Sequence, residues 1–206
     1  MIGFYNYTVL ATYLATIFGV TGLFQAADGN AFRAVICLLF AGLLDTFDGR
    51  IARTKKDRTD SEKRFGVQID SLNDMICFGA LPAAIAYSAG QTRSLWYLTT
   101  LCFFVLAGLI RLAFFNVQEE ERTDGSSRVY YTGLPITSTT VITPLLFLLN
   151  QLIPSAGTVI LGVGMLLNAI LFIAPMQVKK PHGKGIALFA LVGAAELAGL
   201  IYLAVK

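Results

Sequence analysis

The chain has 206 residues, of which 55% are apolar and 14% charged, and its mean hydropathy is +0.66. About a quarter of the residues in an ordinary soluble domain are charged, so this composition argues against a soluble globule and excludes disorder and a coiled coil. The net charge of +3 is too small to indicate nucleic-acid binding. The long apolar runs do not alternate, which favours helices over a β-barrel, and the fold class expected is an all-α integral membrane protein.

Stretches of about 20 apolar residues, the length that crosses a bilayer, recur along the chain. The seven predicted transmembrane helices are residues 7–25, 31–47, 67–87, 95–117, 134–152, 157–174 and 185–205. Splitting or merging the spans after residue 134 would change this count. The connections are short, so residues 1–206 are expected to form a single domain. The N-terminus lacks the charge and cleavage site of a secretory signal, so the first span is expected to remain in the mature protein.

The positive charges predict the orientation of these helices. Cytoplasmic connections of membrane proteins collect Lys and Arg. If the N-terminus lies in the cytoplasm, thirteen of the sixteen Lys and Arg fall on that side, and the exceptions are Arg33, Arg93 and Lys206. We therefore expect a protein of the cytoplasmic membrane whose N-terminus faces the cytoplasm, on the same side as the basic connection between the second and third spans.

Four aspartates flank the basic connection between the second and third spans. Asp45 and Asp48 are three residues apart, and Asp70 and Asp74 are four apart, so each pair shares one face of a helix. A carboxylate inside a membrane helix costs about 2.5–3.5 kcal/mol. If the two helices are neighbours, the four groups converge and repel one another unless they bind protons or cations.

Hard cations such as Mg²⁺ or Mn²⁺ suit a set of ligands that contains only oxygen. The alternative is that the aspartates cap helix ends and pair with Arg50, Arg53 and nearby lysines. Small residues, Gly49 and Ala52 near Arg53 and Gly66 on the facing helix, would let a phosphorylated ligand approach while the guanidinium binds its oxygens. The alternative role of these small residues is close packing of membrane helices.

One pattern carries a family resemblance, and it consists of eight residues in a fixed order: Asp45, Asp48, Gly49, Ala52, Arg53, Gly66, Asp70 and Asp74. This pattern resembles the signature of the CDP-alcohol phosphotransferases, integral-membrane enzymes that make phospholipid head groups and have six core helices. The seventh helix would be an addition. Twelve residues separate Arg53 from Gly66, where the family usually has eight or nine, which indicates a longer cytoplasmic connection.

Residues 70–82, 111–117 and 131–135 look like the phosphatidylserine synthase branch of that family. The resemblance implies that the four aspartates bind two divalent cations, Mg²⁺ or Mn²⁺, and that Asp74 also acts as the base. It implies that Gly49, Ala52, Arg53 and Gly66 line the CDP part of CDP-diacylglycerol. L-serine would attack the lipid-linked phosphorus and CMP would leave. A homodimer is also implied.

Other site residues are open to two interpretations. Arg111 and Asn116 are polar residues within an apolar run and are candidates for binding serine, although Arg111 could instead extend to the membrane surface. Lys184 is a candidate contact of the lipid phosphate or of the cytidine diphosphate, or one more cation that sets the topology. Thr8 and Asn6 could reach the nucleotide, or cap the first helix.

Three other functions stay open from the residues alone. The enzyme could use another acceptor, such as glycerol 3-phosphate or inositol phosphate, because the acceptor rests on the resemblance. A cation transporter or a structural scaffold could also contain membrane aspartates. The clustering of the four acids at one membrane edge, rather than along a path, favours the enzyme over a transporter.

Overall fold

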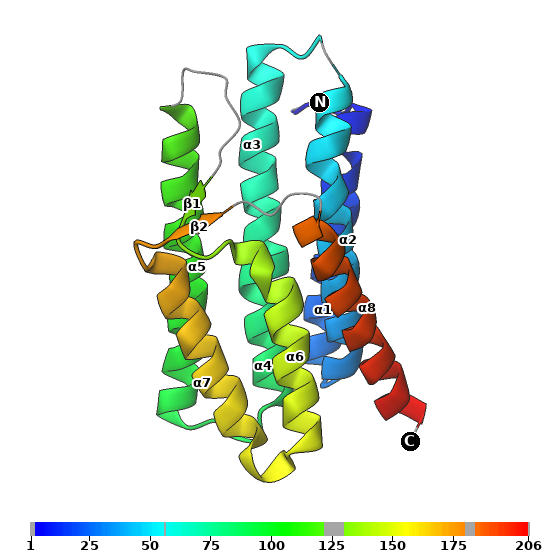
Figure 1. The fold of residues 1–206 in the computed structure, drawn as a ribbon, viewed down its shortest axis with the longest axis vertical. Coiled ribbons are helices and arrows are strands. Elements are labelled where there is room, and N and C mark those ends of the chain that lie inside the picture. Colours follow the sequence, from blue (N-terminus) through cyan, green and yellow to red (C-terminus); the bar gives the residue numbers. More distant parts are fainter. Residues whose placement is uncertain (1–2, 56, 122–129, 180–183, 206) are drawn as a thin grey trace.

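The structure is a computed structural model that describes residues 3–55, 57–121, 130–179 and 184–205. These residues form a bundle of helices with one two-stranded sheet (Figure 1). The elements are α1 (Leu10–Ala27), α2 (Ala31–Thr54), α3 (Asp60–Asp74), α4 (Leu81–Ala89), α5 (Leu95–Glu120), β1 (Tyr130–Thr132), α6 (Thr139–Leu152), α7 (Pro154–Ile173), β2 (Gln177–Lys179) and α8 (Lys184–Val205). Single 3₁₀ turns precede α1 and α6, and six residues of π-helix join α3 to α4. The expected all-α fold class is confirmed.

The seven predicted spans all fall on these helical segments. In the described part of the chain, four segments are long and apolar enough to cross a membrane: Tyr7–Ala27, Asp60–Ala89, Leu95–Glu120 and Pro154–Ile173. The apolar stretch of α6 is shorter, the described side chains of α8 cover Leu191–Leu203 of its 22 residues, and α2 carries Asp45 and Asp48. Large side chains such as Leu109 and Ile110 stay exposed on the outside of the bundle, as a lipid-facing surface requires. The chain is an integral membrane protein, and the number of crossings stays a prediction.

Small residues on α1 bring the first helices of the bundle close together. Ala15 and Gly19 are buried on α1, and a Cβ atom on Gly19 would lie 2.5 Å from Cys77 Sγ of the π-helix. The Cys77 thiol donates a hydrogen bond to the carbonyl oxygen of Ala15 at 3.3 Å. Such close approach is how membrane helices gain packing energy without a hydrophobic driving force between them. It also places α1 against the residues that follow Asp74.

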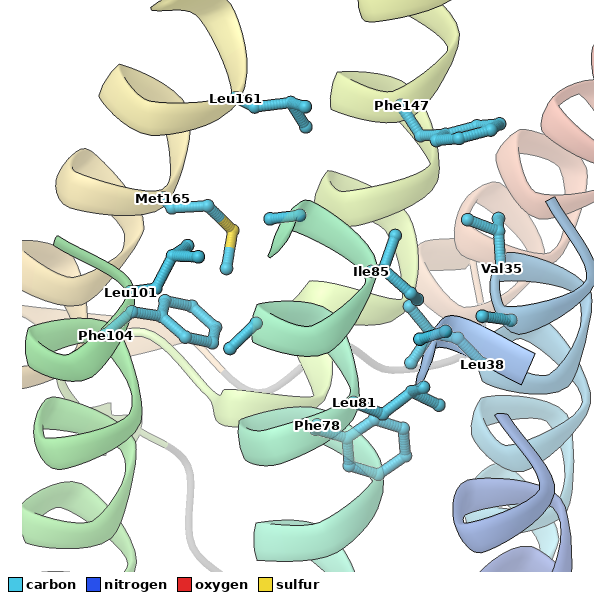
Figure 2. Close-up of a cluster of buried hydrophobic side chains, with 14 of the residues drawn as sticks. Val35, Leu38, Phe78, Leu81, Ile85, Leu101, Phe104, Phe147, Leu161 and Met165 are labelled. Carbon is cyan, nitrogen blue, oxygen red and sulfur yellow. The ribbon is translucent and has the colours of Figure 1, made fainter. Parts of the chain in front are cut away.

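The helical run from α3 through α4 lies in the middle of the bundle. In Figure 2, Phe78, Leu81 and Ile85 of this run lie between side chains of α2 and α6 on one side and of α5 and α7 on the other. All three side chains are fully buried. The central run is therefore fixed by packing on both sides, and the polar half of the same run, α3, is held in a defined rotation.

A side-chain hydroxyl takes the place of the backbone hydrogen bond that Pro82 cannot form in the central run. Proline has no N–H, so Pro82 cannot donate a hydrogen bond to the carbonyl oxygen of Phe78, four residues earlier. The fully buried Thr139 hydroxyl at the start of α6 lies 3.2 Å from this oxygen and shares its single hydrogen between it and the carbonyl oxygen of Ile136 at 2.9 Å. In a membrane, a backbone oxygen needs a partner from within the protein, so this bond fixes α6 to the central run.

The short sheet joins the segment between α5 and α6 to the segment between α7 and α8. Strands β1 and β2 are antiparallel, with Tyr131 opposite Val178. Gly133 follows β1 with φ +77°, and a Cβ atom there would collide with the carbonyl oxygen of Phe172. The Gly133 N–H donates to the carbonyl oxygen of Met176 at 2.8 Å. Both the backbone conformation and the lack of space require glycine at this position.

We expect Gly133→Ala to destabilise the protein by about 1–3 kcal/mol, because alanine is strained at positive φ and its methyl group has no room. Thermal unfolding of the purified protein in detergent measures this loss. Gly193→Ala on α8 is the matched control, since a Cβ atom there meets no atom of the described residues within 4 Å. Equal stability of the two variants would contradict the prediction.

Candidate active site

Four aspartates gather where α1, α2 and α3 meet. Asp45 and Asp48 lie in the C-terminal half of α2, and Asp70 and Asp74 lie at the C-terminal end of α3. Asp48 and Asp74 are buried, while Asp45 and Asp70 are half-buried. None of the four lies in the first turn of its helix, where a carboxylate would cap the free backbone N–H groups. Capping of helix N-termini therefore does not account for them, and the alternative pairing with Arg50 and Arg53 involves side chains outside the described residues.

The carboxyl groups of the four residues lie next to one another. One oxygen from each of Asp45, Asp70 and Asp74 lies within 4.8 Å of the other two. Asp48 lies near enough to Asp70 to interact with it electrostatically, and Asp45 interacts with Asp74 in the same way. Ionised carboxyl groups this close repel one another, so the cluster is stable only if it holds protons or cations.

The oxygen atoms of the cluster are suited to a divalent cation. Asp70 Oδ1 and Asp74 Oδ1 are buried, and neither has a hydrogen-bond partner among the described residues. Leaving a buried carboxylate oxygen without a partner is costly, and a cation removes that cost together with the mutual repulsion. The donors are all oxygens, as hard divalent cations prefer. The side chains present therefore fit a divalent metal.

A cleft of about 230 Å³ opens beside the aspartates. Asp48 and Asp70 line it, together with Gly49, Ala52 and Gly66. Gly49 is exposed, and Ala52 and Gly66 are half-buried, so these small residues are not enclosed between packed helices. Their small size instead leaves the cleft open directly next to the carboxylates, which favours ligand approach over helix packing as their role.

The two candidates near the N-terminus take different positions. Thr8 is buried and lines the cleft. Asn6 does not line it: its side chain accepts hydrogen bonds from the backbone N–H and the hydroxyl of Thr8, and its amide donates to Glu62 Oε1 at 3.0 Å. Asn6 therefore caps the first helical turn, as the capping alternative expected, and ties this turn to α3.

Two other candidates cannot be placed. The side chains of Arg53 and Lys184 lie outside the described residues, although the backbone of Arg53 belongs to α2 and that of Lys184 begins α8. Their expected contacts with the nucleotide and the lipid phosphate stay predictions.

The serine-binding candidates lie between α5 and α3. Arg111 is buried, with 8% of its surface exposed, so it does not extend to the membrane surface. It lies close enough to Asp74 to interact with that carboxylate. Asn116 accepts a hydrogen bond from the Ser71 hydroxyl at 2.7 Å and donates to Gln68 Oε1 at 3.4 Å. Arg111 therefore faces the carboxylate cluster, whereas Asn116 joins α5 to α3.

Several residues at the site were missed in the sequence. Thr12 on α1 donates to Asp48 Oδ2 at 3.5 Å, and the Thr16 hydroxyl, one turn further, reaches Asn73 Oδ1 at 2.8 Å. Their spacing of four residues in an apolar run could have indicated a polar face on α1. Arg58 and Lys63 also line the cleft, and no spacing rule predicts the direction of a side chain in a connecting segment.

The connecting segment between α2 and α3 is held by one glutamate. Glu62 accepts a hydrogen bond from Lys55 Nζ at 2.7 Å, and this bond raises the pKa of Lys55 above its ordinary value. Glu62 also forms a reciprocal pair with Thr59, in which each side chain accepts from the backbone N–H of the other residue. This capping box starts α3 at Asp60.

Comparison with known proteins identifies the family of this chain. A model of the CDP-alcohol phosphatidyltransferase family matches residues 5–177, which include the aspartate cluster and the cleft. The chain belongs to this family. The family resemblance expected from the eight-residue pattern is therefore confirmed. Membership in a family of transferases also favours an enzyme over a transporter or a scaffold.

Curated relatives match a large part of the same region. The chain is 32% identical to the CDP-diacylglycerol–serine O-phosphatidyltransferase of Helicobacter pylori over 148 residues, 71% of this chain and 59% of that protein. It is 33% identical over 144 residues to the enzyme of the same name from Saccharomyces cerevisiae, covering 63% of this chain and 50% of that protein. An archaetidylserine synthase from Methanothermobacter thermautotrophicus is 38% identical over 118 residues, 57% of this chain and 47% of that protein. The matches thus span about half the length of these relatives.

We expect purified protein to bind Mn²⁺, and Asp70→Asn or Asp74→Asn to weaken this binding by at least about tenfold, since each removes a charged ligand. Electron paramagnetic resonance of free Mn²⁺ measures the affinity. The same substitutions should raise the melting temperature of metal-free protein, because they relieve repulsion within the cluster. The control is Asp60→Asn, whose side chain is 89% exposed and binds Lys63. Unchanged Mn²⁺ binding in all three variants would exclude the cluster as the metal site.

Proposed function

We propose that this protein is a phosphatidylserine synthase, which transfers the phosphatidyl group of CDP-diacylglycerol to the hydroxyl of L-serine and releases CMP. The observation that carries the proposal is the cluster of four aspartates beside a cleft lined by small residues, in a chain of the CDP-alcohol phosphatidyltransferase family. The names of the three relatives described above all contain serine, whereas the lipid differs in the archaeal one. Serine is therefore the acceptor that these relatives favour.

The proposal assigns the cations to the aspartate cluster. Asp45, Asp48, Asp70 and Asp74 would hold two divalent cations, Mg²⁺ or Mn²⁺. When bound, such cations neutralise charge on the phosphoryl oxygens and on the leaving group. Gly49, Ala52, Arg53, Gly66 and Thr8 would contact the CDP part of the lipid, with Asn6 supporting Thr8 and Lys184 contacting phosphate.

Asp74 is the proposed general base. A serine hydroxyl is a weak nucleophile at neutral pH, and a carboxylate within reach accepts its proton as the oxygen attacks. The new bond joins the serine oxygen to the lipid-linked phosphorus, the bond from that phosphorus to CMP breaks, and the proton moves to Asp74. Arg111, buried beside Asp74, would bind the serine carboxylate, and Asn116 would position this part of α5 against α3.

The same proposal includes the setting of the enzyme. Residues 1–206 would act as one domain in the cytoplasmic membrane, with the N-terminus and the cleft facing the cytoplasm. The N-terminus, the connection between α2 and α3 and the end of α5 lie at one end of the bundle (Figure 1), and the positive charges of the sequence favour this end as the cytoplasmic one. The lipid chains of the substrate could then stay in the bilayer. A homodimer is proposed from the family resemblance.

The first test is a panel of acceptors. Purified protein with Mg²⁺ or Mn²⁺ and CDP-diacylglycerol should release CMP when L-serine is added, and much less with glycerol 3-phosphate or inositol phosphate. Asp74→Asn should lower kcat by about 10²–10⁴-fold, the usual contribution of a general base, and Asp60→Asn should not. A strong preference for another acceptor would overturn the assignment of serine but leave the metal site standing.

A second test concerns Arg111. We expect Arg111→Gln to raise the KM for serine by about ten- to a hundredfold, the range for a lost charge-assisted hydrogen bond, with little change in the KM for CDP-diacylglycerol. Initial rates of CMP release at varied serine provide the measurement. If only kcat falls and the KM for serine is unchanged, Arg111 acts on Asp74 instead of binding the substrate.

A further inference from the structure

Two basic residues around the connection between α2 and α3 form ion pairs with acidic side chains, and Arg58 does not. Within the described residues, these ion pairs join Lys55 to Glu62 at 2.7 Å and Lys63 to Asp60 at 3.1 Å. Arg58 donates to backbone carbonyl oxygens instead. The positive charge of its guanidinium group is therefore not neutralised by an ion pair in this part of the structure.

Arg58 is held in a fixed position by both helices that flank the segment. Its Nη2 donates to the carbonyl oxygen of Glu62 at 3.2 Å, and Nη1 reaches the carbonyl oxygen of Ala52 at 3.5 Å. Its Nε is buried and has no acceptor among the described residues. The glutamate that supplies the first carbonyl oxygen is itself fixed by the capping box with Thr59. An arginine in this position has a direction determined by the backbone.

Gly66 leaves the space in which this guanidinium group lies. A Cβ atom on Gly66 would lie 2.5 Å from Arg58 Nη2, so a larger residue would displace the end of the arginine side chain. Arg58 and Lys63 line the same cleft as Asp48 and Asp70. The cleft therefore has cationic side chains from the connecting segment (Arg58) and the start of α3 (Lys63), and carboxylates from α2 and α3.

We propose that Arg58, assisted by Lys63, binds the diphosphate of the CDP-lipid and is a substrate-binding residue outside the eight-residue pattern. The inference rests on the proposed function, which supplies a diphosphate as the ligand. Such a ligand has enough oxygens to contact both a guanidinium group, which binds phosphate through parallel N–H donors, and cations held by the aspartates.

The alternative is that Arg58 blocks the nucleotide-binding site. In that case the guanidinium group occupies the place of the nucleotide against Gly66 and must leave before the substrate enters. The two roles predict opposite changes in nucleotide affinity when the Arg58 side chain is removed. Loss of a binding residue weakens the affinity, and loss of a blocking residue strengthens it.

The test uses purified full-length protein and CDP itself, so that binding is measured without turnover. Isothermal titration of CDP in the presence of Mg²⁺ should give an affinity about ten- to a hundredfold weaker for Arg58→Gln than for the unsubstituted protein, as expected for a lost charge-assisted bond. Arg58→Lys should restore part of the affinity. The matched control is Arg64→Gln, which removes the same charge from an exposed position and should leave the affinity unchanged. In the CMP-release assay, Arg58→Gln should raise the KM for CDP-diacylglycerol and not that for serine.

A second variant separates binding from folding of the segment. Gly66→Ala should displace the guanidinium group while leaving the Thr59–Glu62 cap intact, so it should also weaken CDP binding. Wild-type or tighter CDP binding by Arg58→Gln would overturn the role of Arg58. A protein that binds CDP with the expected variant pattern but transfers nothing to serine would instead count against the acceptor, and absence of CDP binding by the unsubstituted protein would overturn both proposals.

Discussion

The repulsion among four carboxyl groups is the constraint on which the site depends. Asp45, Asp48, Asp70 and Asp74 come from two helices and meet beside α1, with oxygens of three of them within 4.8 Å of one another. In an environment of low dielectric constant such a group is unstable without protons or cations. The protein retains this unfavourable arrangement at the edge of a cleft, which is where bound cations would meet a phosphorylated ligand. The cluster therefore makes structural sense chiefly as a binding site.

The rest of the bundle holds these helices in place against that repulsion. Small residues on α1 allow the π-helix to approach, and the buried side chains of α4 hold the central run between two pairs of helices (Figure 2). The bond from Thr139 to Phe78 adds a polar tie where Pro82 interrupts the backbone pattern. The apolar half of the run supplies packing energy, and the polar half supplies the carboxylates.

Some of this arrangement could be predicted from the sequence, and the reason is helical geometry. Spacings of three and four residues place Asp45 with Asp48 and Asp70 with Asp74 on common faces whatever the tertiary structure, and the apolar runs indicate the spans directly. The burial of Arg111 could not be predicted, because a long side chain near a helix end can point either way. The direction of Arg58 depends on the capping box and on the space above Gly66, which no periodicity encodes. The π-helix at Met75–Ala80 has no signal in the hydrophobic pattern either.

This π-helical segment determines how far α3 is rotated relative to α4 about the axis of the central run. It starts immediately after Asp74, so the polar face of α3 and the core face of α4 are related by a wider turn than an α-helix provides. Loss of one residue from the segment would turn α3 by about 100° relative to α4. Either the carboxylates would then leave the junction with α1 and α2, or Leu81 and Ile85 would leave the core. The segment thus acts as a spacer that allows one continuous helix to satisfy two faces at once, and its length is under the same constraint as the identity of the aspartates.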